Sequence, residues 1–322
     1  MSADSSTRLA RTLERLEHFG VKLGLERERR VLGELGSPER RLAVVLVAGT
    51  NGKGSVSSWL ASIATAAGYR SGLFTSPHLE RVEERLRIDG RAISSERLEA
   101  LVDRVVAASR ATGEEVVTFF EALTAAALCW FAEREVDIAV LEVGLGGRLD
   151  ATNVTDPLLS VITSIDLDHQ KQLGETLDRI AREKAGILRP DRPAVASTDK
   201  EEVRSALATA AAEIGAHLEL YGPADAEVEA VELGERGQLV ELRTGRAAYR
   251  LRSRLGGRHQ LDNLRLAVRA AELLADTGFS RIGRRAIEEG IAACAWPGRL
   301  EWIALGEAGE VLLDGAHNPA GL

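Results

Sequence analysis

The sequence predicts an α/β protein in which a mostly parallel sheet is flanked by helices. Short apolar runs alternate with longer amphipathic stretches, which is typical of parallel strands joined by crossover helices. A glycine-rich turn at residues 49–54 joins the first apolar run to a helical pattern, as in phosphate-binding loops (P-loops). Residues 226–251 instead alternate polar and apolar side chains, which predicts a small antiparallel β appendage whose hairpins attach to the main sheet.

Each predicted element rests on the spacing of its apolar residues. Strands are predicted where short apolar runs are bounded by turn residues, at 42–48, 70–75, 137–143, 158–165 and 194–197. Helices are predicted where the apolar period is about 3.6, at 55–67, 96–111, 119–134, 176–187, 201–214, 260–275 and 284–293. After a break at Pro297 and Gly298, two short strand-like runs follow at 300–305 and 310–313.

The composition excludes several classes of protein. Of the 322 residues, 45% are hydrophobic and 28% are charged, as in ordinary soluble domains. The net charge of −8, with basic residues scattered among acidic ones, gives no indication of a nucleic-acid partner. The only two cysteines, Cys129 and Cys294, are isolated, which argues against disulfides and fits a reducing compartment. No run approaches the ~18 apolar residues of a membrane span, so we expect a cytoplasmic protein without a membrane partner.

The stretch VVLVAGTNGKGSVSSWLASIATAAG, residues 44–68, has the outline of a phosphate-binding loop without its common spacing. The form G-x-x-x-x-G-K-[ST] requires glycine where the chain has Val47, and Gly54 separates Lys53 from the hydroxyl of Ser55. Backbone N–H groups at such a turn, with the positive end of the following helix, would bind an anion, and Lys53 would contact its phosphates. A tight turn that merely requires glycine explains the same residues.

Acidic side chains follow two further apolar runs. Glu142 ends one predicted strand, and Asp166, Asp168 and His169 follow another. Because the carboxyl ends of parallel strands meet beside a phosphate loop, a metal site that includes Glu142 and His169 is the favoured interpretation. An arginine could instead neutralise Glu142, and the two aspartates could cap a helix.

A polar segment follows the predicted strand at 70–75. From Ser76 and Pro77 to residue 94 the chain contains only sparse apolar side chains. This is consistent with an ordered loop over a site, and equally with a surface loop.

Eight segments together closely resemble the folylpolyglutamate synthase/dihydrofolate synthase family, a branch of the Mur ligase superfamily. In order they are AGTNGKGSV, TSPHLERVEERLRI, TFFEALTAAAL, LEVGLGGRLDATNV, TSIDLDHQKQLGETLDRIAREKAGI, GGRHQLDNLRLAV, WPGRLEWI and LLDGAHNPAG. The resemblance extends from about Leu16 to the last residue. The loop of this family has the compact form G-T-N-G-K-G-S, so the resemblance removes the objection to the spacing and implies a Mur-ligase central-domain fold.

The resemblance implies ATP-dependent formation of an amide. The carboxyl group of dihydropteroate or a folate would take the γ-phosphoryl group of ATP, and the amine of L-glutamate would attack the acyl phosphate. It further implies ATP and Mg²⁺ as cofactors, small-molecule substrates and a monomer. The segments TFFEALTA and DATNV favour folate over another acid.

The resemblance also implies roles for individual residues. Lys53, His169 and Lys184 would act in catalysis, and Lys184 matches the lysine that the family carbamylates. The metal ligands would be Ser76, Glu142 and His169, and the pterin contacts Thr118, Phe119, Phe120 and Asp150, unless both phenylalanines belong to the core. The ATP contacts would be Thr50, Asn51, Gly52, Lys53, Gly54, Ser55, Asn263, Arg299, Asp314 and His317, with Arg299 at the γ-phosphate and Asp314 at the ribose.

The resemblance predicts two domains, an ATP-binding domain over residues 1–296 and the start of a C-terminal glutamate-ligase domain over 297–322. Family members continue past GAHNP into a second domain of roughly 100 residues, so we expect an almost complete ATPase domain and an incomplete ligase. Three interpretations remain open: a folate ligase present as a fragment or a truncated gene product, a Mur-type ligase for another acid, and a nucleotide-binding remnant that catalyses nothing.

Overall fold

An eight-stranded sheet of order β4-β3-β2-β5-β1-β6-β7-β8 forms the centre of the protein. The computed structural model describes residues 2–20, 22–113, 117–222, 225–234, 237–306, 309–316 and 318. The six neighbouring strands β2-β5-β1-β6-β7-β8 pair in parallel. At one edge, β3 pairs antiparallel with β2 and with β4. The predicted mostly parallel sheet is therefore confirmed.

All five strands predicted for this sheet are present. They are β1 (Val44–Ala48), β2 (Ser71–Phe74), β5 (Ile138–Glu142), β6 (Pro157–Ile162) and β7 (Pro193–Ala196). Every residue of β1, β2 and β5 is buried, because helices cover both faces of a parallel sheet. Sequence reasoning missed the short strands β3 (Leu86–Ile88), β4 (Arg91–Ala92) and β8 (His217–Leu220), which lie at or next to the sheet edges and carry little apolar signal.

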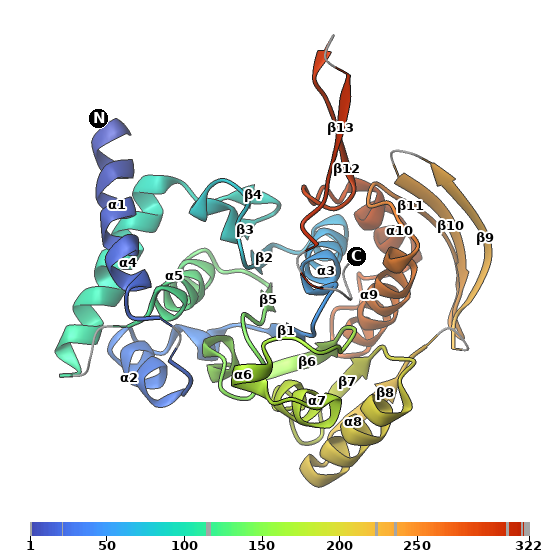
Figure 1. Ribbon diagram of the computed structural model, residues 1–322, viewed down its shortest axis with the longest axis horizontal. Helices are drawn as coiled ribbons and strands as arrows, with labels where there is room; N and C mark the ends of the chain where they lie inside the picture. Colours follow the sequence, from blue (N-terminus) through green and yellow to red (C-terminus); the bar gives the residue numbers. More distant parts are fainter. Residues whose placement is uncertain are drawn as a thin grey trace.

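Helices pack on the two faces of the sheet and form two cores (Figure 1). Residues of β1 alternate between these cores, as the period of two in a strand requires. The first core lies under α1 (Ser2–Glu17), α2 (Glu26–Glu34), α4 (Ser95–Ala111), α5 (Phe119–Glu133), α7 (Leu177–Ala185) and α8 (Glu201–Ile214). The second lies under α3 (Lys53–Ala66), α9 (His259–Asp276) and α10 (Arg284–Ala293).

Two helices of the first core, α1 and α2, were not predicted. Charged residues dominate α2, whereas α1 carries Leu9, Leu13 and Leu16 at helical spacing, a signal that sequence reasoning missed. Short helices complete the connections: η1 (Pro38–Arg41), η2 (Val82–Arg85), η3 (Ala151–Val154) and α6 (Gln170–Leu173). In the described part of the chain, no helix is both long and apolar enough to cross a membrane.

The alternating segment forms a separate sheet of order β11-β10-β9, from β9 (Glu227–Gly234), β10 (Gly237–Arg243) and β11 (Ala248–Ser253). The antiparallel appendage is thus confirmed, but the prediction that it attaches to the main sheet is wrong. Its apolar face instead packs into the second core (Figure 1). Glu272 of α9 anchors this sheet, accepting hydrogen bonds from Thr244 Oγ1 at 2.6 Å and Tyr249 Oη at 2.8 Å.

The last two strands form a ribbon that projects from the rest of the protein (Figure 1). The strands β12 (Glu301–Ala304) and β13 (Glu310–Leu313) pair antiparallel, with Trp302 opposite Leu312 and Ile303 opposite Val311. These pairs lie on opposite faces of the ribbon, and all four side chains are exposed. The two strand predictions are confirmed, while the division into two domains at residue 297 stays a prediction.

The carboxyl group of Glu28 is an unusual component of the first core. Its side chain is fully buried, and neither oxygen has a hydrogen-bond partner among the described residues. Burial, with the nearby charge of Glu121, raises the pKa of Glu28 well above its ordinary value of 4.5, because the charged form loses its hydration. The folded protein therefore retains this proton to a higher pH than the unfolded chain does.

We expect Glu28→Leu to stabilise the protein at neutral pH. In the wild type the free energy of unfolding falls as pH rises from 4.5 towards the raised pKa, because the folded state binds more protons in this range. Below pH 4.5 the carboxyl group is protonated in both the folded and the unfolded state, so it no longer lowers the free energy of unfolding. Denaturant unfolding at a series of pH values should show this fall in the wild type and in the control Glu34→Leu, whose glutamate is exposed on the same helix. An unchanged pH dependence in Glu28→Leu would contradict the prediction.

Candidate nucleotide and ligase site

The glycine-rich turn connects the carboxyl end of β1 to the first turn of α3, as a phosphate-binding loop does. The helix begins at Lys53, and Gly52 before it has a φ of 86°, which glycine adopts without strain. A side chain at Gly52 would also collide with Asn263 of α9. The local structure is that of an anion-binding loop with compact spacing.

The segment that follows β6 holds this loop in place. The N–H of Thr50 donates to Ser164 O at 2.7 Å, and Thr163 Oγ1 donates to Asn51 O at 2.7 Å. The hydroxyl of Thr50 donates to Asp166 O at 3.2 Å and accepts from Asp166 N at 3.0 Å. Thr50 therefore fixes the shape of the loop, and its direct contact with a nucleotide stays a prediction.

Two lysines meet at the carbonyl oxygen of Gly49, the half-buried Lys53 and the buried Lys184. Lys53 Nζ donates to this oxygen at 3.1 Å and to Thr50 O at 3.0 Å, and Lys184 Nζ of α7 donates to the same Gly49 oxygen at 2.7 Å. Burial lowers the pKa of Lys53, and burial together with the charge of Lys53 lowers the pKa of Lys184 to about 7. At neutral pH a substantial fraction of Lys184 is therefore an uncharged amine.

Glu142 lies at the carboxyl end of β5, where it is 4% exposed. Its Oε2 accepts a hydrogen bond from the N–H of Ser76 at 3.0 Å, just beyond the neighbouring strand β2. Burial raises the pKa of Glu142, and the positive charge of Lys53 opposes this rise. The structure thus brings Ser76, Glu142 and Lys53 together, and the side-chain oxygens of the first two are the hard donors that Mg²⁺ prefers.

His169 lies beyond β6, directly before α6. Its side chain is 53% exposed, and its Nε2 is 3.9 Å from Asp168 Oδ2. Over the described ranges, no three His, Cys, Asp or Glu side chains are arranged to hold a metal ion. Neither aspartate of this segment caps α6: Asp166 Oδ2 instead accepts from Lys200 Nζ at 2.6 Å.

Ser55 and Asn263 are linked through a residue that sequence reasoning missed. Gln260 Nε2 donates to Ser55 Oγ at 3.3 Å, and its Oε1 accepts from Asn263 Nδ2 at 3.0 Å. Gln260 and Asn263 are three residues apart on α9 and so share one face of the helix. That spacing was the signal in the sequence that could have found Gln260.

The predicted pterin contacts lie at the start of α5. Thr118 caps the helix, with its Oγ1 accepting from Glu121 N at 3.3 Å. Phe119 and Phe120 are half-buried: Phe120 packs against Phe74 with 5.7 Å between ring centroids, and the guanidinium of Arg85 lies 5.0 Å from the centre of Phe119. The two rings therefore pack on the edge of the first core without being fully enclosed.

Asp150 is buried and caps η3. Its Oδ1 accepts from Thr152 N at 3.0 Å and Thr152 Oγ1 at 2.6 Å, and its Oδ2 accepts from Leu145 N at 2.8 Å. Burial raises the pKa of Asp150, and these hydrogen bonds oppose the rise. The carboxylate shapes the turn after β5 in this structure.

Arg299 and Asp314 lie at the base of the projecting ribbon. Asp314 accepts from Leu300 N at 2.8 Å and Ala316 N at 2.7 Å, so the backbone occupies both of its carboxylate oxygens. The charge of Arg299 lowers the pKa of both Glu142 and Lys53, which shows that it lies near the loop. His317, also predicted to contact ATP, lies outside the described residues.

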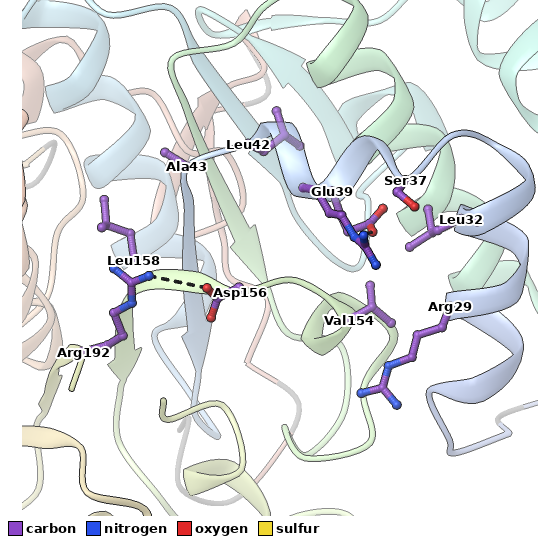
Figure 2. A pocket seen from close by; sticks show the side chains of 12 residues that line it. Arg29, Leu32, Ser37, Glu39, Leu42, Ala43, Val154, Asp156, Leu158 and Arg192 are labelled. Atoms are coloured by element: carbon purple, nitrogen blue, oxygen red, sulfur yellow. Dashed lines mark hydrogen bonds and ion pairs between the residues drawn. The ribbon is translucent and has the colours of Figure 1, made fainter. Parts of the chain in front are cut away.

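A cavity of about 550 Å³ lies at the amino ends of the central strands β1 and β6, away from the phosphate loop at their carboxyl ends (Figure 2). Leu42 and Ala43 line it just before β1, and Asp156 and Leu158 line it at the start of β6. Its Arg192 pairs with Asp156 at 3.5 Å. None of the predicted site residues lines this cavity, so we place the candidate site at the phosphate loop.

Comparisons with known proteins show which family this chain belongs to. The pattern of the Mur ligase middle domain matches residues 47–271, more than half of the chain. Together with the parallel sheet and the phosphate loop, this match defines an ATP-dependent, amide-forming ligase of the Mur class. Within that class, the chain belongs to the folylpolyglutamate synthase/dihydrofolate synthase family.

The relatives that carry this assignment are similar over nearly the whole chain. The dihydrofolate synthase/folylpolyglutamate synthase of Bacillus subtilis is 40% identical over 311 residues, 94% of this chain and 71% of the relative. A folylpolyglutamate synthase solved with AMPPCP and folate has a TM-score of 0.89 at 34% identity, covering 98% of this chain and 78% of that one. The folylpolyglutamate synthase of Thermotoga maritima has a TM-score of 0.86 at 34% identity, covering 98% and 72%.

Proposed function

We propose that this protein joins L-glutamate to the carboxyl group of dihydropteroate, of a folate or its polyglutamates, or of both, using ATP. The observation that carries the proposal is the half-buried Lys53 of the phosphate loop, whose positive charge acts on the buried Glu142. This arrangement occurs in a chain that belongs to a family of glutamate ligases. One related structure is a complex with AMPPCP, an analogue of ATP, and folate, which supports ATP and a folate as substrates here.

The proposed reaction has two steps. The substrate carboxylate attacks the γ-phosphorus of ATP, the bond to the ADP oxygen breaks, and an acyl phosphate forms. The amine of L-glutamate then attacks the acyl carbon, the C–N bond forms, and inorganic phosphate leaves with the C–O bond electrons. Phosphorylation is needed because a carboxylate oxygen is a poor leaving group. The protein contributes positioning and charge neutralisation, from Lys53 and the N–H groups of Gly52, Gly54 and Ser55.

Mg²⁺ is part of the same proposal. Ser76 and Glu142 would hold it, because their oxygens are hard donors and the two residues are already hydrogen-bonded. A bound Mg²⁺ would neutralise negative charge on the transferring phosphoryl group. His169, on the same edge of the sheet, would serve a second ion.

The remaining predicted residues would bind the two organic substrates. Phe119 and Phe120 have partly accessible rings that suit stacking on a pterin, next to the helix start at Thr118. Asp150 would accept hydrogen bonds from the pterin ring. The ATP contacts would be completed by Asn51, by Asn263, and by Arg299, Asp314 and His317, with Arg299 at the γ-phosphate and Asp314 at the ribose.

We further propose that the protein acts as a monomer in the cytoplasm. Both cysteines are buried and unpaired, which fits a reducing compartment. The proposed substrates are small molecules, so no macromolecular partner is needed for the reaction.

Incorporation of radiolabelled L-glutamate tests the proposed function. Purified protein would be incubated with ATP and Mg²⁺, and with either dihydropteroate or tetrahydrofolate as acceptor. ATP-dependent incorporation into either acceptor is the expected result, and the pattern shows whether one or both reactions occur. Binding of AMPPCP without incorporation into either acceptor would overturn the proposal and favour a nucleotide-binding remnant.

A further inference from the structure

Asn318 contacts the phosphate loop from a distant part of the sequence. Its Oδ1 accepts a hydrogen bond from Asn51 Nδ2 at 3.1 Å, and its Nδ2 donates to Asn51 Oδ1 at 3.1 Å. The two amide groups thus form a closed pair of reciprocal hydrogen bonds. Asn318 is 8% exposed, so water has little access to replace either bond.

The same amide also reaches a carboxylate on the other side of the loop. Asn318 Nδ2 donates to Asp168 Oδ2 at 3.4 Å. The charge of Asp168 opposes the fall in the pKa of both Lys53 and Lys184. One side chain therefore joins the phosphate loop to the acidic segment after β6.

The backbone of Asn51 is fixed independently of this contact. Its carbonyl oxygen accepts from Thr163 Oγ1 at 2.7 Å and from Ser164 Oγ at 3.2 Å. With the backbone held, the hydrogen bonds to Asn318 set the orientation of the Asn51 amide. An amide is the group suited to this place, because it donates and accepts in one plane, whereas a carboxylate cannot donate.

We propose that Asn318 is a positioning residue for the nucleotide site. It orients the amide of Asn51 and the carboxylate of Asp168 together, and so couples the segment after the β12–β13 ribbon to the phosphate loop. Asn318 needs no contact with the nucleotide itself. The inference rests on the proposed function, because it takes the loop to be the binding site of ATP.

Binding of AMPPCP with Mg²⁺, measured by isothermal titration calorimetry, tests this inference. We expect Asn318→Ala to weaken binding about tenfold, which corresponds to the net contribution of roughly one hydrogen bond. Asn318→Asp should weaken it further, because a carboxylate would face both Asn51 Oδ1 and Asp168. The double variant Asn51→Ala/Asn318→Ala should lose less affinity than the sum of the two single variants, since the Asn51–Asn318 pair acts as a unit and only the contact with Asp168 is lost in addition.

Two measurements and a replacement variant separate positioning from a loss of folding. Val311→Thr, on the exposed ribbon, is the matched control and should bind as the wild type does. Thermal midpoints of all variants should match that of the control, and Asn318→Ser replaces any variant that fails to fold. Equal affinity of wild type and Asn318→Ala, or additive effects in the double variant, would overturn the inference. Failure of the wild type to bind AMPPCP would overturn the proposed nucleotide site, and the inference with it.

Discussion

Lys53→Met should lower the rate of ATP-dependent glutamate incorporation by about 100-fold or more. The proposed transition state develops negative charge on the phosphoryl oxygens, and Lys53 is the half-buried cation at the start of α3 beside the loop. Methionine retains the length of the side chain and removes its charge. The measurement is kcat for glutamate incorporation, with Lys171→Met as control, because Lys171 is an exposed lysine of α6.

The charge of Glu142 allows loss of folding to be separated from loss of chemistry. Lys53→Met leaves the buried Glu142 without its main compensating charge, which destabilises the fold. Adding Glu142→Gln removes the uncompensated carboxylate and should recover much of the unfolding free energy. The double variant should remain inactive, because both the cation and the proposed metal ligand are gone. A near-normal kcat in Lys53→Met would contradict the site assignment.

Lys184→Ala should also lower the rate of glutamate incorporation, by about 100-fold or more. Here the group that is lost is the proposed carbamate on Lys184. In the structure the Nζ atoms of Lys53 and Lys184 donate to the same oxygen of Gly49, so their positive charges repel each other. Carbamylation of Lys184 would replace one cation with an anion and turn this repulsion into attraction. The modified side chain could then support the cations of the site. Added acetate or formate should partly restore Lys184→Ala by supplying a carboxylate.

The pKa of Lys184 gives this prediction a pH dependence. Carbamylation requires the neutral amine, and burial lowers the pKa of Lys184 to about 7. The neutral fraction, and with it the carbamate, should therefore increase as pH rises through this value. Carbon-13 NMR in labelled bicarbonate should show a carbamate signal that grows across this range in the wild type and is missing in Lys184→Ala. Full activity of Lys184→Ala would rule out the role.

Much of the fold follows from local patterns in the sequence. The continuous apolar run of β1 and the glycine turn after it predicted a buried parallel strand leading into α3, and both are present. The charged helix α2 and the edge strand β4 were missed, because few apolar residues mark them. The helix α1 was missed although Leu9, Leu13 and Leu16 have helical spacing. The attachment of the β9–β11 sheet was mispredicted, because alternation shows that one face is buried and not which surface buries it.

The candidate site shows the same division. The sequence by itself determined the chemical groups of the site, because its motifs contain Lys53 after the first strand, Glu142 at the end of β5 and Lys184 in α7. Only the tertiary structure decided that two lysines share the carbonyl of Gly49, and that Asn318 pairs with Asn51 at a separation of 267 residues. Such contacts join residues that no local period relates, and they form only when burial of the two cores brings distant segments together.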